Sequence, residues 1–292
     1  MASSKLIRVP SLQVGDQSDA PSATLDDLRA FVDAHPRLLV LTGAGLSTRS
    51  GIPAYRNAQG KWLRRDPILY QDFIAEAATR RRYWARSFFG WSMMQTAQPN
   101  SAHRALAAME GDGRIELLVT QNVDGLHRAA GSEALVELHG ALDRVSCLDC
   151  GEGITRNALQ EALLARNPNW RPEVLGYRPD GDAELDASAY PGFEVVDCAN
   201  CGGRLKPDVV FFGESVPPER AERIEAALAA CDGLLVVGSS LVVMSGFRIV
   251  RGARALGRPV VAINDGRTRA DGLLEFKVGG DCVEVLTALT EA

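Results

Sequence analysis

Four of the six cysteines form two close pairs, Cys147-x-x-Cys150 and Cys198-x-x-Cys201. Two cysteines separated by two residues can hold a metal ion from one tight turn, and two such pairs complete a tetrahedral four-thiolate zinc site. The N-terminus lacks the apolar core of a secretion signal, so paired cysteines favour metal binding over disulfides. We therefore predict one structural zinc ion, with a disulfide pairing as the alternative.

A glycine turn follows the first strongly apolar run of the chain. Residues 38–41 are apolar and lead into Thr42-Gly43-Ala44-Gly45-Leu46-Ser47. An apolar run bounded by glycine predicts a buried strand. Glycine lets the backbone approach a ligand closely, and a helix that begins here would face a phosphate with its free N–H groups. We predict a pyrophosphate-binding turn. Thr48 replaces the third glycine of the usual dinucleotide fingerprint, so an ordinary strand connection is the alternative.

Three further apolar runs end in small or hydrogen-bonding residues. Strands predicted over 115–120, 234–237 and 259–263 are followed by Gln121-Asn122-Val123-Asp124, Gly238-Ser239-Ser240 and Asn264-Asp265-Gly266. Strands that alternate with helical patterns are typical of a parallel, doubly wound sheet. Because ligands of such sheets lie beyond the carboxyl ends of the strands, these ends predict one crevice sized for a dinucleotide.

A histidine stands at another predicted strand end. Residues 135–138 precede His139-Gly140, which places the imidazole well for exposure in a cleft. Its ordinary pKa near 6.5 suits a general base. The loop that contains Tyr55 and Arg56 would lie over the nucleotide and contact a ribose, a phosphate or a reacting group; the alternative is a surface loop.

Two helices are predicted before the second strand. Thr24 can cap a helix that starts at residue 25 and ends near His35-Pro36, which makes His35 a helix-end residue. A second helix covers residues 101–109, and its His103 is interpreted as structural.

Residues 61–97 are rich in arginine and aromatic side chains, several of them at helical spacing. We predict a helical subdomain that packs its own core. Arg80-Arg81-Arg82 would form a solvated helix face, or alternatively contact an acidic substrate or acyl group.

Two more elements are predicted after the second cysteine pair. Residues 209–213 read as a buried strand, and Pro218 starts a helix. Cys231 falls on the apolar face of that helix and is interpreted as a core residue.

The charge and hydropathy of the chain exclude two classes of partner. The net charge is −5, and the segment from Cys147 to Cys201 holds four arginines against ten acidic residues, so nucleic acid is not expected. No apolar run reaches the length of a membrane span. We expect residues 1–21 to be a mobile leader, a cytoplasmic location with the mitochondrial matrix as alternative, and favour a monomer.

These motifs together resemble the sirtuin family, in the family's own order along roughly residues 25–285. The resemblance is carried by Gly43-Ala44-Gly45-x-Ser47, Gly51-Ile52-Pro53-x-Tyr55-Arg56, Thr120-Gln121-Asn122-Val123-Asp124, Leu138-His139-Gly140, the two cysteine pairs, Lys206-Pro207-x-Val209-Val210-Phe211-Phe212-Gly213-Glu214, Val237-Gly238-Ser239-Ser240 and Ile263-Asn264. Arg82-Tyr83-Trp84-Ala85-Arg86 and Trp91 look like the class II branch, which includes the mitochondrial deacylase and lipoamidase of animals.

Two positions depart from the family's pattern. Ala54 stands where many members carry an acidic or aromatic residue. Residues 61–64 read Lys-Trp-Leu-Arg, without the Tyr-x-x-Arg pair of desuccinylase-type members, which argues against succinyl specificity.

The resemblance implies a Rossmann-like NAD-binding domain with a helical module and a zinc-binding module inserted in it. The implied ranges are 22–60, 105–146 and 205–292 for the NAD-binding domain, 61–104 for the helical module and 147–204 for the zinc-binding module.

The resemblance also implies a reaction, the removal of acyl groups from protein lysine side chains with NAD as co-substrate. The acyl oxygen attacks the ribose C1′ as nicotinamide leaves, His139 takes a proton through the ribose hydroxyls, and water finally yields free lysine and O-acyl-ADP-ribose. The implied catalytic residues are His139, Asn122 and Asp124. The implied NAD-binding residues are Gly43, Ala44, Gly45, Ser47, Tyr55, Arg56, Gln121, Asn122, Val123, Asp124, Gly238, Ser239, Ser240, Asn264, Asp265, Gly266 and Cys282. The acyl-lysine peptide would add as a strand along Val210, Phe211, Phe212, Gly213 and Glu214.

Two alternative functions stay open at this point. A protein mono-ADP-ribosyltransferase would use the same NAD site but would need His139 less. A non-catalytic NAD-sensing zinc scaffold would be expected to have lost His139 or Asn122, and both are present. No feature of the sequence supports a hydride-transfer dehydrogenase.

Overall fold

The computed structural model describes residues 19–53, 67–177 and 181–291. The sequence-based expectations for Ala54, Tyr55, Arg56, residues 61–64 and most of the leader therefore lie outside the described residues. Residues 21–23 lie along an edge of the main sheet, because the carbonyl oxygen of Pro21 accepts a hydrogen bond from the backbone N–H of Lys277 at 2.8 Å.

The main sheet has six parallel strands in the order β11-β10-β9-β1-β2-β3. The strands are β1 (Leu38–Thr42), β2 (Ile115–Thr120), β3 (Leu135–Glu137), β9 (Gly233–Val237), β10 (Val260–Ile263) and β11 (Phe276–Val278). Successive strands run outward from β1 on one side and from β9 on the other, so the order reverses between these two central strands. The predicted doubly wound, Rossmann-like sheet is confirmed.

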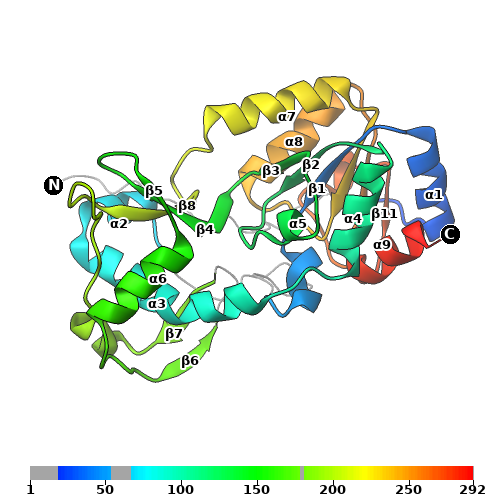
Figure 1. The fold of residues 1–292 in the computed structure, drawn as a ribbon. Coiled ribbons are helices and arrows are strands. Elements are labelled where there is room, and N and C mark those ends of the chain that lie inside the picture. The colour runs from blue at the N-terminus through cyan, green and yellow to red at the C-terminus, as the bar shows by residue number, and fades with distance from the viewer. Residues whose placement is uncertain (1–18, 54–66, 178–180, 292) are drawn as a thin grey trace.

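Helices cover both faces of this sheet (Figure 1). On one face lie α1 (Leu25–Ala34), α4 (Ser101–Gly111) and α9 (Cys282–Thr290); on the other lie α7 (Pro218–Ala230) and α8 (Met244–Ala255). The strand side chains alternate between the two layers, and all five residues of both β1 and β9 are buried. This burial on both sides explains why the strands read as continuous apolar runs.

Several local predictions are confirmed. Thr24 and Asp27 form a reciprocal capping box at the start of α1, and His35 is the C-cap of that helix. His103 is fully buried in α4, where its Nδ1 accepts a hydrogen bond from the backbone N–H of Asn100 at 3.3 Å. Cys231 is fully buried in the core under α7.

The strand predicted over 209–213 is wrong. The strand is β8 (Leu205–Val209), and the chain leaves it after Val209. Residues 210–212 have the apolar composition of a strand, but Phe212 makes only an isolated parallel β-bridge, to Leu69, the residue before α2. A left-handed Gly213, with φ of 86°, then turns the chain away.

A smaller part of the molecule lies beside the main sheet (Figure 1). Its antiparallel sheet has the order β5-β4-β8, with β4 (Gly140–Cys147) and β5 (Gly153–Thr155). The other elements are α2 (Tyr70–Ala75), α3 (Ala77–Thr96), α6 (Arg156–Arg166) and the hairpin of β6 (Val174–Tyr177) and β7 (Ala183–Leu185). Three short 3₁₀ helices, η1 (Ala44–Ser50), η2 (Ala187–Gly192) and η3 (Asp271–Leu273), and the single turn α5 (Leu126–Ala129) complete the described elements.

The helical segment does not pack a core of its own, so that expectation is wrong. Tyr83, Trp84 and Phe88 of α3 share one apolar cluster with Leu159 and Leu163 of α6 and with residues beside the cysteine pairs. Aromatic side chains at helical spacing show that a core exists but not which segment supplies its other half.

Arg80-Arg81-Arg82 does not form a solvated face, because all three side chains are half-buried. Arg80 donates from Nη1 to the carbonyl oxygens of Phe73 and Ile74, both at 2.9 Å, and so joins α3 to the end of α2. None of the helices that the structure describes is long and apolar enough to cross a membrane.

Candidate active site

The glycine turn lies at the point where the strand order reverses. The N–H of Gly43 donates to Val237 at 3.0 Å and the N–H of Gly45 donates to Gly238 at 2.9 Å. A Cβ on Gly43 would lie 2.7 Å from Ser239 Cβ, and one on Gly45 would lie 2.9 Å from Gly238 Cα. Only glycine therefore allows the loops after β1 and β9 to pack this closely. The 3₁₀ helix η1 begins within the turn, at Ala44, with Gly43 as its N-cap.

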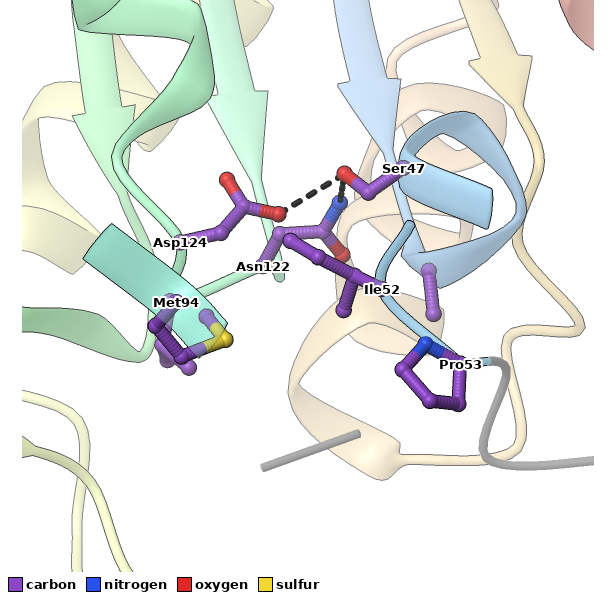
Figure 2. Close-up of a pocket in the computed structure, with 8 residues that line it drawn as sticks. Ser47, Ile52, Pro53, Met94, Asn122 and Asp124 are labelled. Carbon is purple, nitrogen blue, oxygen red and sulfur yellow. Dashed lines mark hydrogen bonds between the residues drawn. The ribbon is translucent and has the colours of Figure 1, made fainter. Parts of the chain in front are cut away.

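Three polar side chains from two strand ends converge beside this turn (Figure 2). Asn122 donates from Nδ2 to Ser47 Oγ at 3.0 Å and to the carbonyl of Gly43 at 3.1 Å. Ser47 in turn donates to Asp124 Oδ2 at 2.7 Å, and Asp124 Oδ1 accepts from the N–H of Leu126 at 2.9 Å. The network fixes the orientation of the Asn122 amide and the Asp124 carboxyl.

Burial raises the pKa of Asp124, although the hydrogen bonds from Leu126 and Ser47 oppose that rise. A carboxyl group kept out of bulk water in this way gains most from a polar or cationic partner. Asp124 lines a small pocket that is partly open to solvent. The pocket's other lining residues are Ala44, Ser47, Ile52, Pro53, Met94, Asn122 and Val123.

Gln121 connects the ends of three strands. Its Nε2 donates to Ser239 Oγ at 2.7 Å and to the carbonyl of Thr42 at 3.2 Å. The remaining predicted positions also lie at the carboxyl ends of the strands. Ser240 follows β9, and Asn264, Asp265 and Gly266 follow β10. Cys282 starts α9, and a Cβ on Gly238 would lie 3.1 Å from its Sγ. The structure thus brings the described candidates for the nucleotide to the carboxyl ends of the strands, as expected for this sheet.

His139 is held from both ring nitrogens. Its Nδ1 lies 2.9 Å from the carbonyl oxygen of Gln121, and its Nε2 lies 2.7 Å from Ser245 Oγ. Because a carbonyl oxygen only accepts, Nδ1 carries the proton in the neutral ring and Nε2 is left as the acceptor. The ring is therefore oriented as a base, with its lone pair on Nε2.

The residue after His139 has to be glycine. Gly140 has a φ of 81°, and a Cβ there would lie 1.8 Å from the carbonyl oxygen of Asp208. This close approach brings the end of β8 beside His139, whose carbonyl oxygen accepts from the N–H of Val210 at 2.9 Å. The catalytic candidate and the candidate peptide segment are therefore neighbours.

Ser245 is a site residue that sequence reasoning missed. It lies in the first turn of α8, five residues beyond the Gly238-Ser239-Ser240 motif. A serine near a helix start is ordinarily interpreted as part of a cap. Its contact with His139 depends on how α8 packs over the end of β2, where a Cβ on Gly246 would lie 2.4 Å from Gln121 Oε1.

The four paired cysteines form one cluster. Their Sγ atoms all lie within 4.8 Å of one another, with Cys147 and Cys201 at 3.5 Å and Cys150 and Cys198 at 3.8 Å. Tetrahedral zinc with Zn–S bonds of about 2.3 Å requires sulfur separations of about 3.8 Å, so the cluster fits the ion. Backbone and side-chain N–H groups also point at the sulfurs, since Asp149 N lies 3.4 Å from Cys147 Sγ and Asn200 Nδ2 lies 3.8 Å from Cys150 Sγ. The predicted four-cysteine zinc site is confirmed.

The fold and the site together define a class of protein. A six-stranded Rossmann-like sheet carries a polar crevice at its switch point and an oriented histidine, and an inserted module carries four zinc-ligating cysteines. This combination describes a dinucleotide-binding enzyme with a structural zinc module.

Comparison with known proteins gives the family. The family model for the Sir2 family matches residues 43–245. An NAD-dependent protein deacetylase of Xanthomonas campestris is 53% identical over 264 residues, which is 90% of each chain. The mitochondrial NAD-dependent protein lipoamidase sirtuin-4 of Bos taurus is 48% identical over 274 residues, covering 91% of this chain and 87% of its own.

Solved structures agree with these relatives. A complex of a Sir2 homologue with NAD has a TM-score of 0.71 at 26% identity, and covers 94% of this chain and 96% of its own. A complex of Sir2 with a p53 peptide and NAD⁺ has the same TM-score and identity, and covers 92% and 98%. The chain belongs to the Sir2 family, the sirtuins, and is an NAD-dependent protein deacetylase.

Proposed function

We propose that this deacetylase transfers the acyl group of an acyl-lysine side chain to the ADP-ribose part of NAD, and that His139 is the general base. The observation that carries the proposal is the pair of contacts on His139. Nδ1 is fixed by the carbonyl of Gln121, and the lone pair of Nε2 is directed at a hydroxyl, that of Ser245. A ring held in this way can take a proton from a ribose hydroxyl that replaces Ser245 as its partner.

The NAD substrate would lie along the carboxyl ends of the strands. Gly43, Ala44 and Gly45 would face its pyrophosphate, and the loops after β9 and β10, with the start of α9 at Cys282, would hold the adenosine half. Ser47, Asn122 and Asp124 line the pocket beside the turn, which suits the nicotinamide ribose and carboxamide. Amide and carboxyl groups held by hydrogen bonds suit this task because they need no reorganisation when the substrate binds.

The acyl-lysine substrate would bind as an extended strand along residues 210–214, where the end of β8 adjoins His139. The Sir2 structure solved with a p53 peptide and NAD⁺ supports a peptide substrate. Backbone hydrogen bonds would give affinity without strict dependence on sequence. The acyl chain would enter toward the apolar side of the pocket, formed by Ile52, Met94 and Val123, which favours uncharged acyl groups.

The proposal also covers the cellular location of the protein and a second candidate activity. The bacterial relatives support a cytoplasmic location, and the bovine mitochondrial relative supports the mitochondrial matrix as the alternative. Protein mono-ADP-ribosylation stays the second candidate activity, because it would use the same NAD site.

Mass spectrometry of the products tests the proposal. The enzyme is incubated with NAD and peptides that carry acetyl-, branched acyl-, lipoyl-, long-chain acyl- or succinyl-lysine. We expect deacylated peptide together with O-acyl-ADP-ribose, and the least product from the succinyl peptide. A peptide that gains the mass of ADP-ribose would support the transferase instead. Absence of both products, with zinc content and NAD binding intact, would support the non-catalytic reading.

The pH dependence provides a separate prediction. Burial lowers the pKa of His139; the hydrogen bond to Gln121 opposes this, and the positive charge of Arg220 adds to it. The base acts as neutral imidazole, so activity is present above its pKa and is lost as the pH falls through that value. We therefore expect the acid limb of kcat/KM below the ordinary histidine pKa of 6.5. A profile of kcat/KM from about pH 5 to 9 measures it, and an acid limb above 6.5 would contradict the assignment.

A further inference from the structure

The side chain of Lys206 is buried at the start of the candidate peptide segment. The residue is 7% exposed and lies in β8, between the zinc module and residues 210–214. Its Nζ donates to the carbonyl of Val209 at 2.6 Å and to that of Pro207 at 3.3 Å. A buried ammonium group is stable only where it is fully paired, and its remaining partner among the described residues is the carboxylate of Glu214, at 3.0 Å.

Glu214 in turn fixes the shape of the segment. Its Oε2 accepts a hydrogen bond from the N–H of Phe211 at 2.8 Å, and its own N–H donates to the carbonyl of Phe211 at 3.0 Å. These two bonds close a turn over residues 211–214 around the left-handed Gly213. The same carboxylate oxygen thus contacts both the turn and Lys206.

The lysine also lies against the elements on the other side of the segment. Its Nζ lies 4.9 Å from the ring centroid of Phe211 and 5.9 Å from that of Tyr70, distances at which an ammonium group is attracted to an aromatic face. The backbone N–H of Tyr70 donates to the carbonyl of Phe212 at 2.9 Å. Lys206 is therefore in contact with β8, with the turn and with the first residue of α2.

We propose that Lys206 is a positioning residue for the acyl-lysine peptide, which holds residues 210–214 in the conformation that the peptide binds through its bond to Glu214. The inference rests on the proposed function in one respect, that residues 210–214 bind the peptide. Lys206 lies outside the row of strand ends assigned to the nucleotide, and among the residues that the structure describes its printed contacts are with none of those assigned to NAD. Its loss therefore weakens peptide binding and leaves NAD binding and the chemical step intact.

Steady-state kinetics on the zinc-loaded enzyme test this, with NAD and an acetyl-lysine peptide as substrates. Lys206→Met keeps the length of the side chain and removes the charge and all three donors. We expect it to raise the KM for the peptide about tenfold or more, because two carbonyls and a carboxylate lose their partner. The kcat at saturating peptide and the Kd for NAD, measured by calorimetry, stay within about threefold of wild type, a change of about 0.6 kcal/mol.

Two further variants separate positioning from simple stability. Lys206→Arg keeps the charge and the donors, and we expect it to restore the peptide KM to within about threefold of wild type. Arg37→Met breaks a surface ion pair with Asp232 at the amino-terminal ends of the central strands β1 and β9, and its peptide KM should equal that of wild type.

Several outcomes would overturn the proposal. An unchanged peptide KM in folded Lys206→Met would do so, as would a fall in kcat at constant KM, or a failure of Lys206→Arg to restore binding. If Lys206→Met has a lowered melting temperature or loses zinc, Glu214→Gln replaces it in the test. Glu214→Gln keeps the lysine and should show the same rise in the peptide KM. Wild-type enzyme that forms no deacylated peptide would refute the proposed function rather than the role of Lys206.

Discussion

Replacing His139 with alanine lowers the turnover of an acetyl-lysine peptide by about 10²–10⁴, the usual contribution of a positioned general base. The half-buried ring has its two nitrogens in contact with Gln121 and Ser245, and His139 lies beyond the end of β3 rather than within a strand of the main sheet. Alanine therefore removes the base and leaves the sheet intact. Single-turnover assays with saturating NAD and peptide measure the acyl-transfer step directly.

His35→Ala is the matched control. His35 caps the C-terminus of α1 and lies under Gly233, at the opposite end of β9 from the crevice. Its loss should leave turnover within about twofold of wild type, since changes away from the site rarely affect the chemistry. Near-normal single-turnover acyl transfer in His139→Ala would remove the assignment of the base. A fall in the melting temperature of His139→Ala without a fall in turnover would show a purely structural residue.

The parts of the fold that the sequence predicts are those with a local cause. β1 and β9 read as strands because they are apolar on both faces, and both faces are buried. The start of α1 is predicted because its capping box lies within four residues. The zinc site is predicted because each cysteine pair already has the spacing of a metal-binding turn.

The parts that the sequence does not predict depend on contacts between distant segments. Ser245 meets His139 across 106 positions of the chain, and nothing near Ser245 in the sequence indicates that contact. The apolar residues 210–212 have the composition of a strand, but their backbone partners are His139 and Leu69, the residue before α2. In both cases tertiary packing, not local preference, decides the position of the residue.

The aromatic residues of α3 show the same limit of prediction from local sequence, because they share their apolar core with two cysteines of the zinc site. Cys147 is 3% exposed and Cys198 is 6% exposed, and both belong to the apolar cluster that contains Tyr83, Trp84 and Phe88. The zinc ion would therefore stabilise two modules that the sequence presents as separate. The cysteine cluster also lies at the C-terminal end of β4, and the first residue of β4, Gly140, directly follows His139.

We expect Cys147→Ala to lose zinc and to unfold the smaller part of the molecule. Structural zinc contributes about 10 kcal/mol or more to folding, which is comparable with the whole stability of a typical domain, about 5–15 kcal/mol. Unfolding should extend to α3, because α3 shares the apolar core with the cysteines, and to β4, because Cys147 is the last residue of that strand. Hydrogen exchange should then become fast in α3, α6, β4 and β8 and stay slow in β1 and β9, whose residues are all buried in the main sheet.

Cys231→Ala is the control. That cysteine is fully buried in the core between the main sheet and helices α7 and α8, apart from the four zinc-site cysteines. It should keep its zinc and lose about 1–2 kcal/mol of stability, as expected for a small cavity. Zinc content by atomic absorption and calorimetric melting compare the variants. Complete loss of zinc from Cys147→Ala with an unchanged melting curve would show that the ion does not support the fold. Retention of zinc would show that three thiolates suffice, since the other three cysteines would still surround the ion.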